Sequence, residues 1–179
     1  MKFSRGGATY VGERRKGLNV RELYTKLCKW SMNLGTIDGI FCHSFLVLSW
    51  NLACKLNNMG EVYLTEINWA MYFDTFDVFF AHTENQTGID TKYLLHLYAN
   101  QINPPICPLF ALSWYFFWCC NSSLDLGSLL YPGRNQHSRF RDACWRENVD
   151  EVNTLGFSVQ DIGTHSICKG AVSYLASRH

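Results

Sequence analysis

The feature that most constrains the fold is a long run of residues with almost no polar side. From Asp38 to Leu52 the chain reads DGIFCHSFLVLSWNL, which contains no lysine, arginine or glutamate. A helix that is apolar nearly all round has no face suited to water, so other elements have to surround it. We therefore predict a helix that is capped by Asp38 and lies buried at the centre of the molecule.

Composition favours a packed domain. Hydrophobic residues make up 47% of the 179 residues and aromatic residues 15%, enough for a sizeable core. We expect residues 1–18 to be a mobile lead-in or the remnant of a preceding domain, and residues 19–179 to form one domain. The net charge of +1 excludes a strongly basic nucleic-acid binder but allows a local basic face.

The eight cysteines include no CxxC pair, and most of them lie inside apolar runs. This pattern argues against a zinc ribbon and favours free, mostly buried thiols in a reducing intracellular compartment. The chain opens with a polar, arginine-rich segment rather than a signal peptide. We expect no metal and no cofactor.

Three further helices are predicted around the central one. Apolar spacing predicts a helix from Asn19 that ends at Gly35. A polar helix with an apolar stripe is predicted over Ser138–Glu147, with its apolar positions turned inward. A last helix is predicted over Ser166–Leu175, with Thr164 as its cap.

One more helix is predicted from Cys107 to about Cys120, and it is almost wholly apolar. Because a membrane span needs about 20 apolar residues, this run is too short for one. We predict a core helix, with the aromatic run from Trp114 to Trp118 buried.

Between these helices, the spacing and type of the apolar residues change to those typical of β-strands. Segments rich in β-branched and aromatic residues predict strands at Glu61–Ile67, Phe76–His82 and Tyr93–Tyr98. Three short antiparallel strands would form a small sheet beside a helical body, which makes the fold class α+β.

Four segments, in this order along the chain, resemble the motifs of one family: WNLACKLNN (residues 50–58), FAHTENQ (80–86), YANQINPPICP (98–108) and DIGTHSI (161–167). They are similar to the catalytic domain of eukaryotic tyrosine recombinases of the Crypton type, and the resemblance extends from about Arg21 to Ser177. It implies a mainly helical recombinase core with a small three-stranded antiparallel sheet.

The resemblance also implies a chemistry. In tyrosine recombinases a tyrosine attacks a DNA phosphate and forms a covalent phosphotyrosyl intermediate. Two arginines neutralise the charge that develops on the phosphate, a hairpin lysine protonates the leaving oxygen, and a histidine assists. The family acts in DNA recombination and DNA integration without a metal. The implied partner is duplex DNA, with a possible homo-oligomer on it, and the implied location is the nucleus.

This chain departs from the family at most catalytic positions. By the motifs, Lys55 stands at the first arginine, Glu84 at the hairpin lysine and Cys168 at the second arginine, whereas His165 matches. The resemblance places the nucleophilic tyrosine beyond His179. Lysine keeps the charge but loses the bidentate grip on phosphate, and a thiol donates weakly. We therefore predict that the chain does not cleave or join DNA by itself.

Each of these residues also has a purely structural interpretation. His165 can cap or pack at the start of its helix, and Lys55 can reach solvent at a helix end favoured by the dipole. Glu84 at a hairpin tip can be an ordinary solvated charge. Cys168 can be an inert thiol, because Cys168 and His165 together supply only two ligands, which make a poor metal site.

Two functional classes follow. In the first, a recombinase-like domain retains DNA binding through phosphate contacts from basic residues around the altered site: Lys92, Arg134, Arg139, Arg141 and Lys169. In the second, the same fold is a protein-interaction domain without a DNA partner, or a relic of a mobile element.

Overall fold

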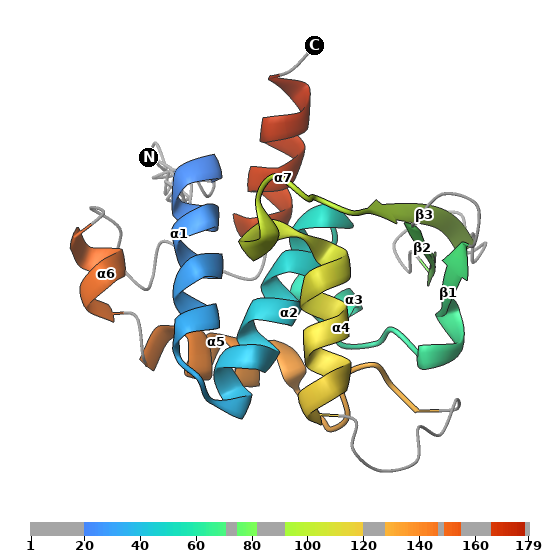
Figure 1. Cartoon of the computed structure of the whole chain (residues 1–179), viewed down its shortest axis with the longest axis horizontal. Helices are drawn as coiled ribbons and strands as arrows, with labels where there is room; N and C mark the ends of the chain where they lie inside the picture. Colours follow the sequence, from blue (N-terminus) through green and yellow to red (C-terminus); the bar gives the residue numbers. More distant parts are fainter. Residues whose placement is uncertain are drawn as a thin grey trace, which may run out of the picture.

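A computed structural model describes residues 20–70, 75–81, 92–119, 128–146, 149–154 and 166–177. Within these ranges the chain is a mainly helical α+β structure with seven α-helices and one three-stranded antiparallel sheet (Figure 1). The α-helices are α1 (Val20–Asn33), α2 (Ile37–Asn51), α3 (Leu56–Met59), α4 (Pro108–Cys119), α5 (Gln136–Arg146), α6 (Val149–Thr154) and α7 (Ser166–Ala176). The strands are β1 (Ile67–Ala70), β2 (Thr75–Ala81) and β3 (Lys92–Tyr98).

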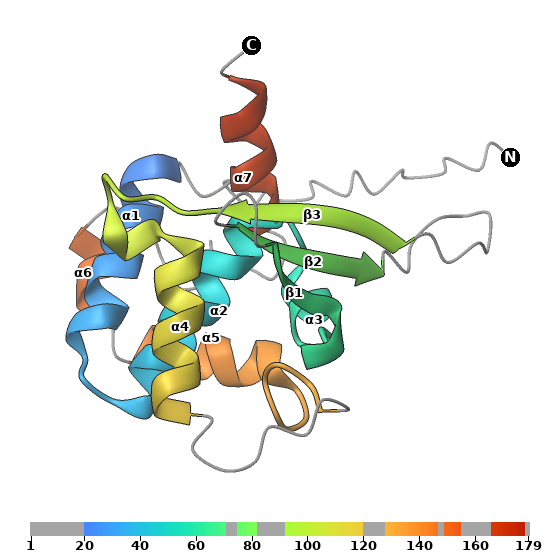
Figure 2. The same ribbon diagram turned by 45° about the vertical axis from the view of Figure 1, so that its right-hand side comes forward.

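Helix α2 lies at the centre, as its apolar sequence predicts. Every residue from Gly39 to Ser49 is buried, and α1, α4, α5 and α7 pack around the helix (Figures 1 and 2). The predicted cap is wrong. Thr36 is the N-cap, and its Oγ1 accepts a hydrogen bond of 3.0 Å from the Gly39 amide. Asp38 lies in the first turn instead, where its carboxylate binds Arg139.

The core around α2 is rich in aromatic rings from distant parts of the chain. The ring of Phe45 stacks on that of Phe140 in α5 at 5.2 Å, and Tyr131 packs edge-on against Phe45 at 5.0 Å. The buried Tyr131 hydroxyl is not left unpaired, because it lies 2.6 Å from the Ser44 hydroxyl. Burial raises the pKa of Tyr131 well above its usual value. These contacts fix α5 and the segment before it onto α2.

The sheet has the order β1-β2-β3, and both pairings are antiparallel. The second and third predicted strands are confirmed. The first is displaced, because the predicted range Glu61–Ile67 is mostly a turn that leads into β1 at Ile67. In that turn the Glu66 carboxylate accepts a hydrogen bond of 3.0 Å from the Tyr63 amide and closes a 3₁₀ turn over Leu64–Glu66. Just before it, residues 62–64 pair with residues 128–130, where Tyr63 and Leu129 form an isolated antiparallel bridge, so this segment does not join the sheet.

Helix α4 is half core and half surface. One face, with Ala111, Leu112 and Tyr115, is buried. Phe117 and Trp118 are exposed, so the prediction that the whole aromatic run is core is wrong for these two. The reason is geometric, since α4 packs on α2 with one face and its opposite face meets no element of the described structure in the views of Figures 1 and 2.

Other local predictions hold. Helix α1 ends before Gly35, which has a φ of +62° and so adopts the left-handed conformation that glycine favours. In α5 the predicted inward residues Phe140, Ala143 and Cys144 are buried. The short helices α3 and α6 were not predicted.

The cysteines of the described residues are free thiols, and five of the seven are buried, as predicted. Over the same part of the chain, no helix combines the length and the apolar character that crossing a membrane requires. The predicted lead-in over residues 1–18 lies outside the described residues.

Candidate functional site

The candidate site is built on the turn that ends α2. Ala53 has a φ of +46°, a left-handed conformation that side chains rarely adopt, and it breaks the helix sharply. The amides of Ala53 and Cys54 still donate hydrogen bonds to the carbonyls of Trp50 and Ser49, at 3.0 and 3.1 Å. The turn is therefore held on α2, and it delivers Lys55 as the N-cap residue of α3.

The first turn of α7 lies against this turn. The Cys168 thiol donates a hydrogen bond of 2.9 Å to the Ala53 carbonyl, across 115 positions of sequence. Partial burial raises the pKa of the Cys168 thiol, and the positive charge of Lys55 opposes that rise. The structure thus brings Lys55 and Cys168 together, two positions that the motifs align with the family's arginines.

Aromatic packing fixes α7 in this place. The Trp50 ring stacks on Tyr24 of α1 at 4.3 Å and also meets Tyr174 of α7, with the two ring centres 6.3 Å apart. The small residues Gly170 and Ala171 are buried and let α7 approach closely. The turn that carries Cys168 is therefore held by packing as well as by its own hydrogen bond.

The thiols here stay protonated. Burial raises the pKa of Cys54 to about 12, and the nearby Cys168 adds to that rise. Because both thiols resist ionisation, neither behaves as the low-pKa thiolate of a reactive cysteine. At neutral pH these two thiols therefore carry no charge beside Lys55.

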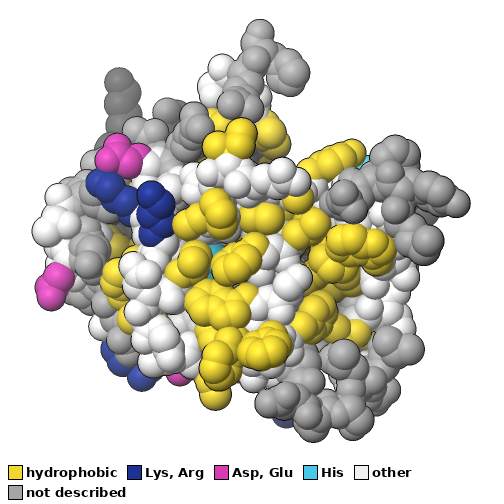
Figure 3. Space-filling model, in the orientation of Figure 1, with side chains coloured by type: hydrophobic (Ala, Val, Ile, Leu, Met, Phe, Trp, Pro, Cys, Tyr) yellow, Lys and Arg dark blue, Asp and Glu magenta, His cyan; other side chains and the backbone are white. Residues whose placement is uncertain are grey.

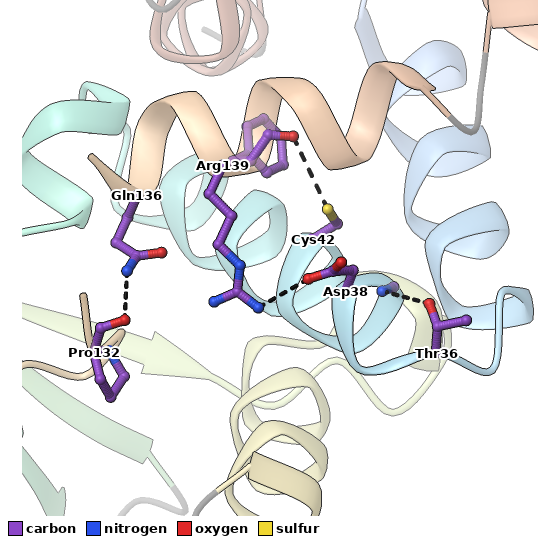
Figure 4. Close-up of polar contacts among 8 residues, drawn as sticks. Thr36, Asp38, Cys42, Pro132, Gln136 and Arg139 are labelled. Carbon is purple, nitrogen blue, oxygen red and sulfur yellow. Dashed lines mark hydrogen bonds and ion pairs between the residues drawn. The ribbon is translucent and has the colours of Figure 1, made fainter. Parts of the chain in front are cut away.

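Arg139 does not belong to this site. Its guanidinium donates to the Asp38 carboxylate at 2.9 Å (Figure 4). It also lies over the Phe41 ring, 4.1 Å from its centre. Asp38 stands at the N-terminal end of α2, whereas Lys55 follows the C-terminal end. At 1.5 Å of rise per residue the two ends of this helix are about 20 Å apart.

The other residues predicted from the sequence for DNA binding or catalysis are not brought together in the described part of the structure. Arg141 pairs with the neighbouring Asp142 at 3.3 Å, Arg134 is exposed before α5, and Lys169 is exposed beside Cys168. The side chain of Lys92 and the residues Glu84 and His165 lie outside the described part of the structure.

One face of the molecule is clearly not basic. Figure 3 shows hydrophobic side chains over much of the face that carries α4, with lysine and arginine chiefly at its left-hand margin. A duplex needs cations where it lies on the protein, so this face offers DNA little.

Sequence reasoning missed His43, in the middle of α2. Its side chain is fully buried, and its Nε2 donates to the Pro105 carbonyl at 2.8 Å. Burial lowers the pKa of His43 to about 4, so the imidazole is neutral at physiological pH. Among the described residues its Nδ1 has no hydrogen-bond partner. The available signal was an ionisable residue inside an otherwise apolar helix.

A histidine paired with an aspartate lies on the sheet. His96 Nδ1 is 2.7 Å from Asp77 Oδ1, and the two residues are direct partners across β2 and β3. Neither this pair nor any other part of the described chain gathers three or more of the residue types that ligate metals.

Comparison with protein-family models, with curated proteins and with solved structures finds no match for this chain.

Proposed function

We propose that the chain is a tyrosine-recombinase-like domain of the Crypton type that binds duplex DNA without cleaving it. The observation that carries the proposal is the contact between the turn of Lys55 and the first turn of α7 with Cys168. In the family that the chain resembles, the positions of Lys55 and Cys168 are occupied by the two arginines that bind one phosphate. A shared phosphate site requires these two positions to lie close together, and the contact between segments 115 positions apart supports this.

The residues present support binding better than catalysis. A lysine attracts phosphate as a point charge but lacks the planar fork that an arginine presents to two oxygens. The protonated thiol of Cys168 adds no charge, because its pKa is raised. Losing one preorganised donor in the transition state costs about 10²–10³ in rate. With both arginines replaced, we expect no cleavage.

Phosphate contacts are then expected at the Lys55 end of α2. Lys169 is exposed on α7 next to Cys168, so its charge is available to the same phosphate or to its neighbour. Arg134 and Arg141 are exposed further away and would add sequence-independent attraction. Arg139 contributes less in this proposal, since Asp38 neutralises it.

A salt series tests this proposal. Binding of a fluorescent duplex is measured by anisotropy at increasing salt, with the affinity expected to fall steeply as phosphate-bound counterions return. Lys169→Gln is expected to weaken binding and to lower the salt slope by about one. The matched control is Lys29→Gln, since Lys29 is an exposed lysine on α1. Absence of binding at low salt would contradict the proposal.

Cleavage is tested separately with a suicide substrate that traps a covalent protein–DNA adduct. We expect no adduct from this chain. An adduct would show that the chain is an active recombinase and would contradict the proposal that it does not cleave DNA.

The second candidate function is a protein-interaction domain on the same fold. It is favoured by the exposed aromatic side chains of α4, which serve no role in binding phosphate. DNA binding that is absent or independent of salt would favour this candidate.

A further inference from the structure

Helix α4 carries a second apolar face that the other described elements leave uncovered. Its sequence, PLFALSWYFFWC, contains no charged residue. Opposite its buried face, Phe110 is 40% exposed and Phe117 73%, and Trp118, one turn beyond the buried Tyr115 at the end of the helix, is 54% exposed. Solvent-facing helix surfaces are normally polar, so an uncharged aromatic face is a mark of an interaction site.

The rings form two pairs along the helix. Phe110 and Trp114 lie 5.8 Å apart between ring centres, and Phe117 and Trp118 lie 5.7 Å apart. Figure 3 shows hydrophobic side chains following one another along this helix, in the orientation of Figure 1.

The exposed area suits a small specific interface. At about 200 Å² per large side chain, the exposed fractions of Phe110, Phe117 and Trp118 amount to roughly 330 Å². A standard interface buries about 800 Å² per partner, and weaker specific ones bury less. The half-buried Trp114 and the backbone between these residues add to the exposed area of this face.

The spacing of the rings is self-complementary. Phe110 and Trp118 each stand four residues from Trp114, one turn before it and one turn after it. If two copies of α4 pack antiparallel about a two-fold axis at Trp114, Phe110 of each copy meets Trp118 of the other. Because the helix is uncharged, no like charges oppose this pairing.

We propose that the outer face of α4 is a homodimer interface, in which a second copy of this chain packs antiparallel across Trp114. An uncharged face gives DNA phosphates no partner, and α4 has none of the lysines and arginines that accompany helices lying on membranes. A second copy supplies an apolar, uncharged surface of matching length. This proposal does not depend on DNA binding.

Sedimentation equilibrium of the whole chain tests it first. The wild-type chain is expected to reach twice its monomer mass of 20.6 kDa as its concentration rises. Trp118→Glu is expected to weaken the dimer by at least about thirtyfold, as loss of a central aromatic anchor does. The matched control is Leu175→Glu, because Leu175 is 56% exposed on α7 and should leave dimerisation unchanged.

Cross-linking then tests the arrangement. In a Cys119→Ser background, Phe110→Cys and Trp118→Cys are made as separate chains and treated with a short bismaleimide. An antiparallel pair brings position 110 of one copy to position 118 of the other, so a mixture of the two chains should form a covalent dimer. Each chain alone should give only the level of the Cys119→Ser parent.

Several outcomes would overturn the proposal. They are a wild-type chain that stays monomeric at every concentration, a dimer that survives Trp118→Glu, and cross-linking in the single chains that equals that in the mixture. A monomer that binds neutral lipid vesicles through α4, shown by loss of binding in Trp118→Glu, would assign the face to a membrane instead. Far-UV circular dichroism verifies that each variant is folded.

Discussion

The two ends of helix α2 use their basic residues in opposite ways. At the N-terminal end, Arg139 is fixed between the Asp38 carboxylate and the Phe41 ring, so its charge serves the tertiary structure. At the C-terminal end, Lys55 stands beside a neutral thiol on a tight turn that joins α2, α3 and α7. What lies next to each basic side chain, rather than how many basic residues the chain has, therefore separates Arg139, a structural residue, from Lys55, a candidate phosphate-binding residue.

The largest effect is expected from the core under the N-terminal end. Phe41→Ala removes a fully buried ring that also supports Arg139, and should lower the free energy of unfolding by about 3–5 kcal/mol. Urea unfolding measures this loss. Ile37→Ala, at an exposed site on the same helix, is the control and should change stability by less than about 0.5 kcal/mol. Equal losses would show that this end is not packed as described.

Between the two ends, His43 makes stability depend on pH. Its pKa is about 4 when folded and near 6.5 when unfolded, so the unfolded chain takes up a proton that the folded chain does not. Acid therefore favours unfolding, with about 3 kcal/mol lost as pH falls from 6.5 to 4 and none of this loss above pH 6.5.

Urea unfolding at a series of pH values measures this dependence. His43→Leu should flatten the curve over that window, although it also removes the hydrogen bond to Pro105 and lowers stability at neutral pH by about 1 kcal/mol. A pH dependence that is the same in both proteins would contradict the assignment to His43.

Breaking the ion pair at the N-terminal end should cost less. Arg139→Gln is expected to lower the free energy of unfolding by about 1 kcal/mol, because both partners are partly exposed and water screens them. The loss should shrink in high salt, where the pair is already weakened. A salt-independent loss would mean that packing on Phe41, rather than charge, holds Arg139.

The smallest effect on stability is expected at the C-terminal end. Cys168→Ala removes one hydrogen bond to the Ala53 carbonyl and should cost about 0.5–1 kcal/mol in thermal or urea unfolding. Cys168→Ser retains a donor and is the matched control. A much larger loss in Cys168→Ala would show that this turn is a structural element rather than a tolerant binding site.

Much of the fold was predictable because the signals are local. The apolar run of α2 predicts a central helix, and the stripe of Phe140, Ala143 and Cys144 predicts which side of α5 is buried. The misses have physical causes. Residues 62–64 pair with the distant residues 128–130 instead of with the sheet, and one-sided packing left Phe117 exposed despite its apolar neighbourhood.

The candidate site was harder to predict, because its contacts are distant in sequence. Periodicity alone does not place Cys168 on the Ala53 carbonyl; only the family resemblance paired their segments. Nor does it show that Arg139 meets Asp38, 101 positions away, so sequence reasoning counted that arginine among the DNA-binding residues. That prediction is still untested, although the ion pair now gives Arg139 a structural partner.

The most direct test of the account compares the two ends of α2 in one DNA titration. The salt slope of duplex binding is measured for the wild type, Lys55→Gln and Arg139→Gln. The account predicts that Lys55→Gln lowers the slope by about one phosphate contact, whereas Arg139→Gln leaves it unchanged. A slope that falls in Arg139→Gln and not in Lys55→Gln would contradict the account.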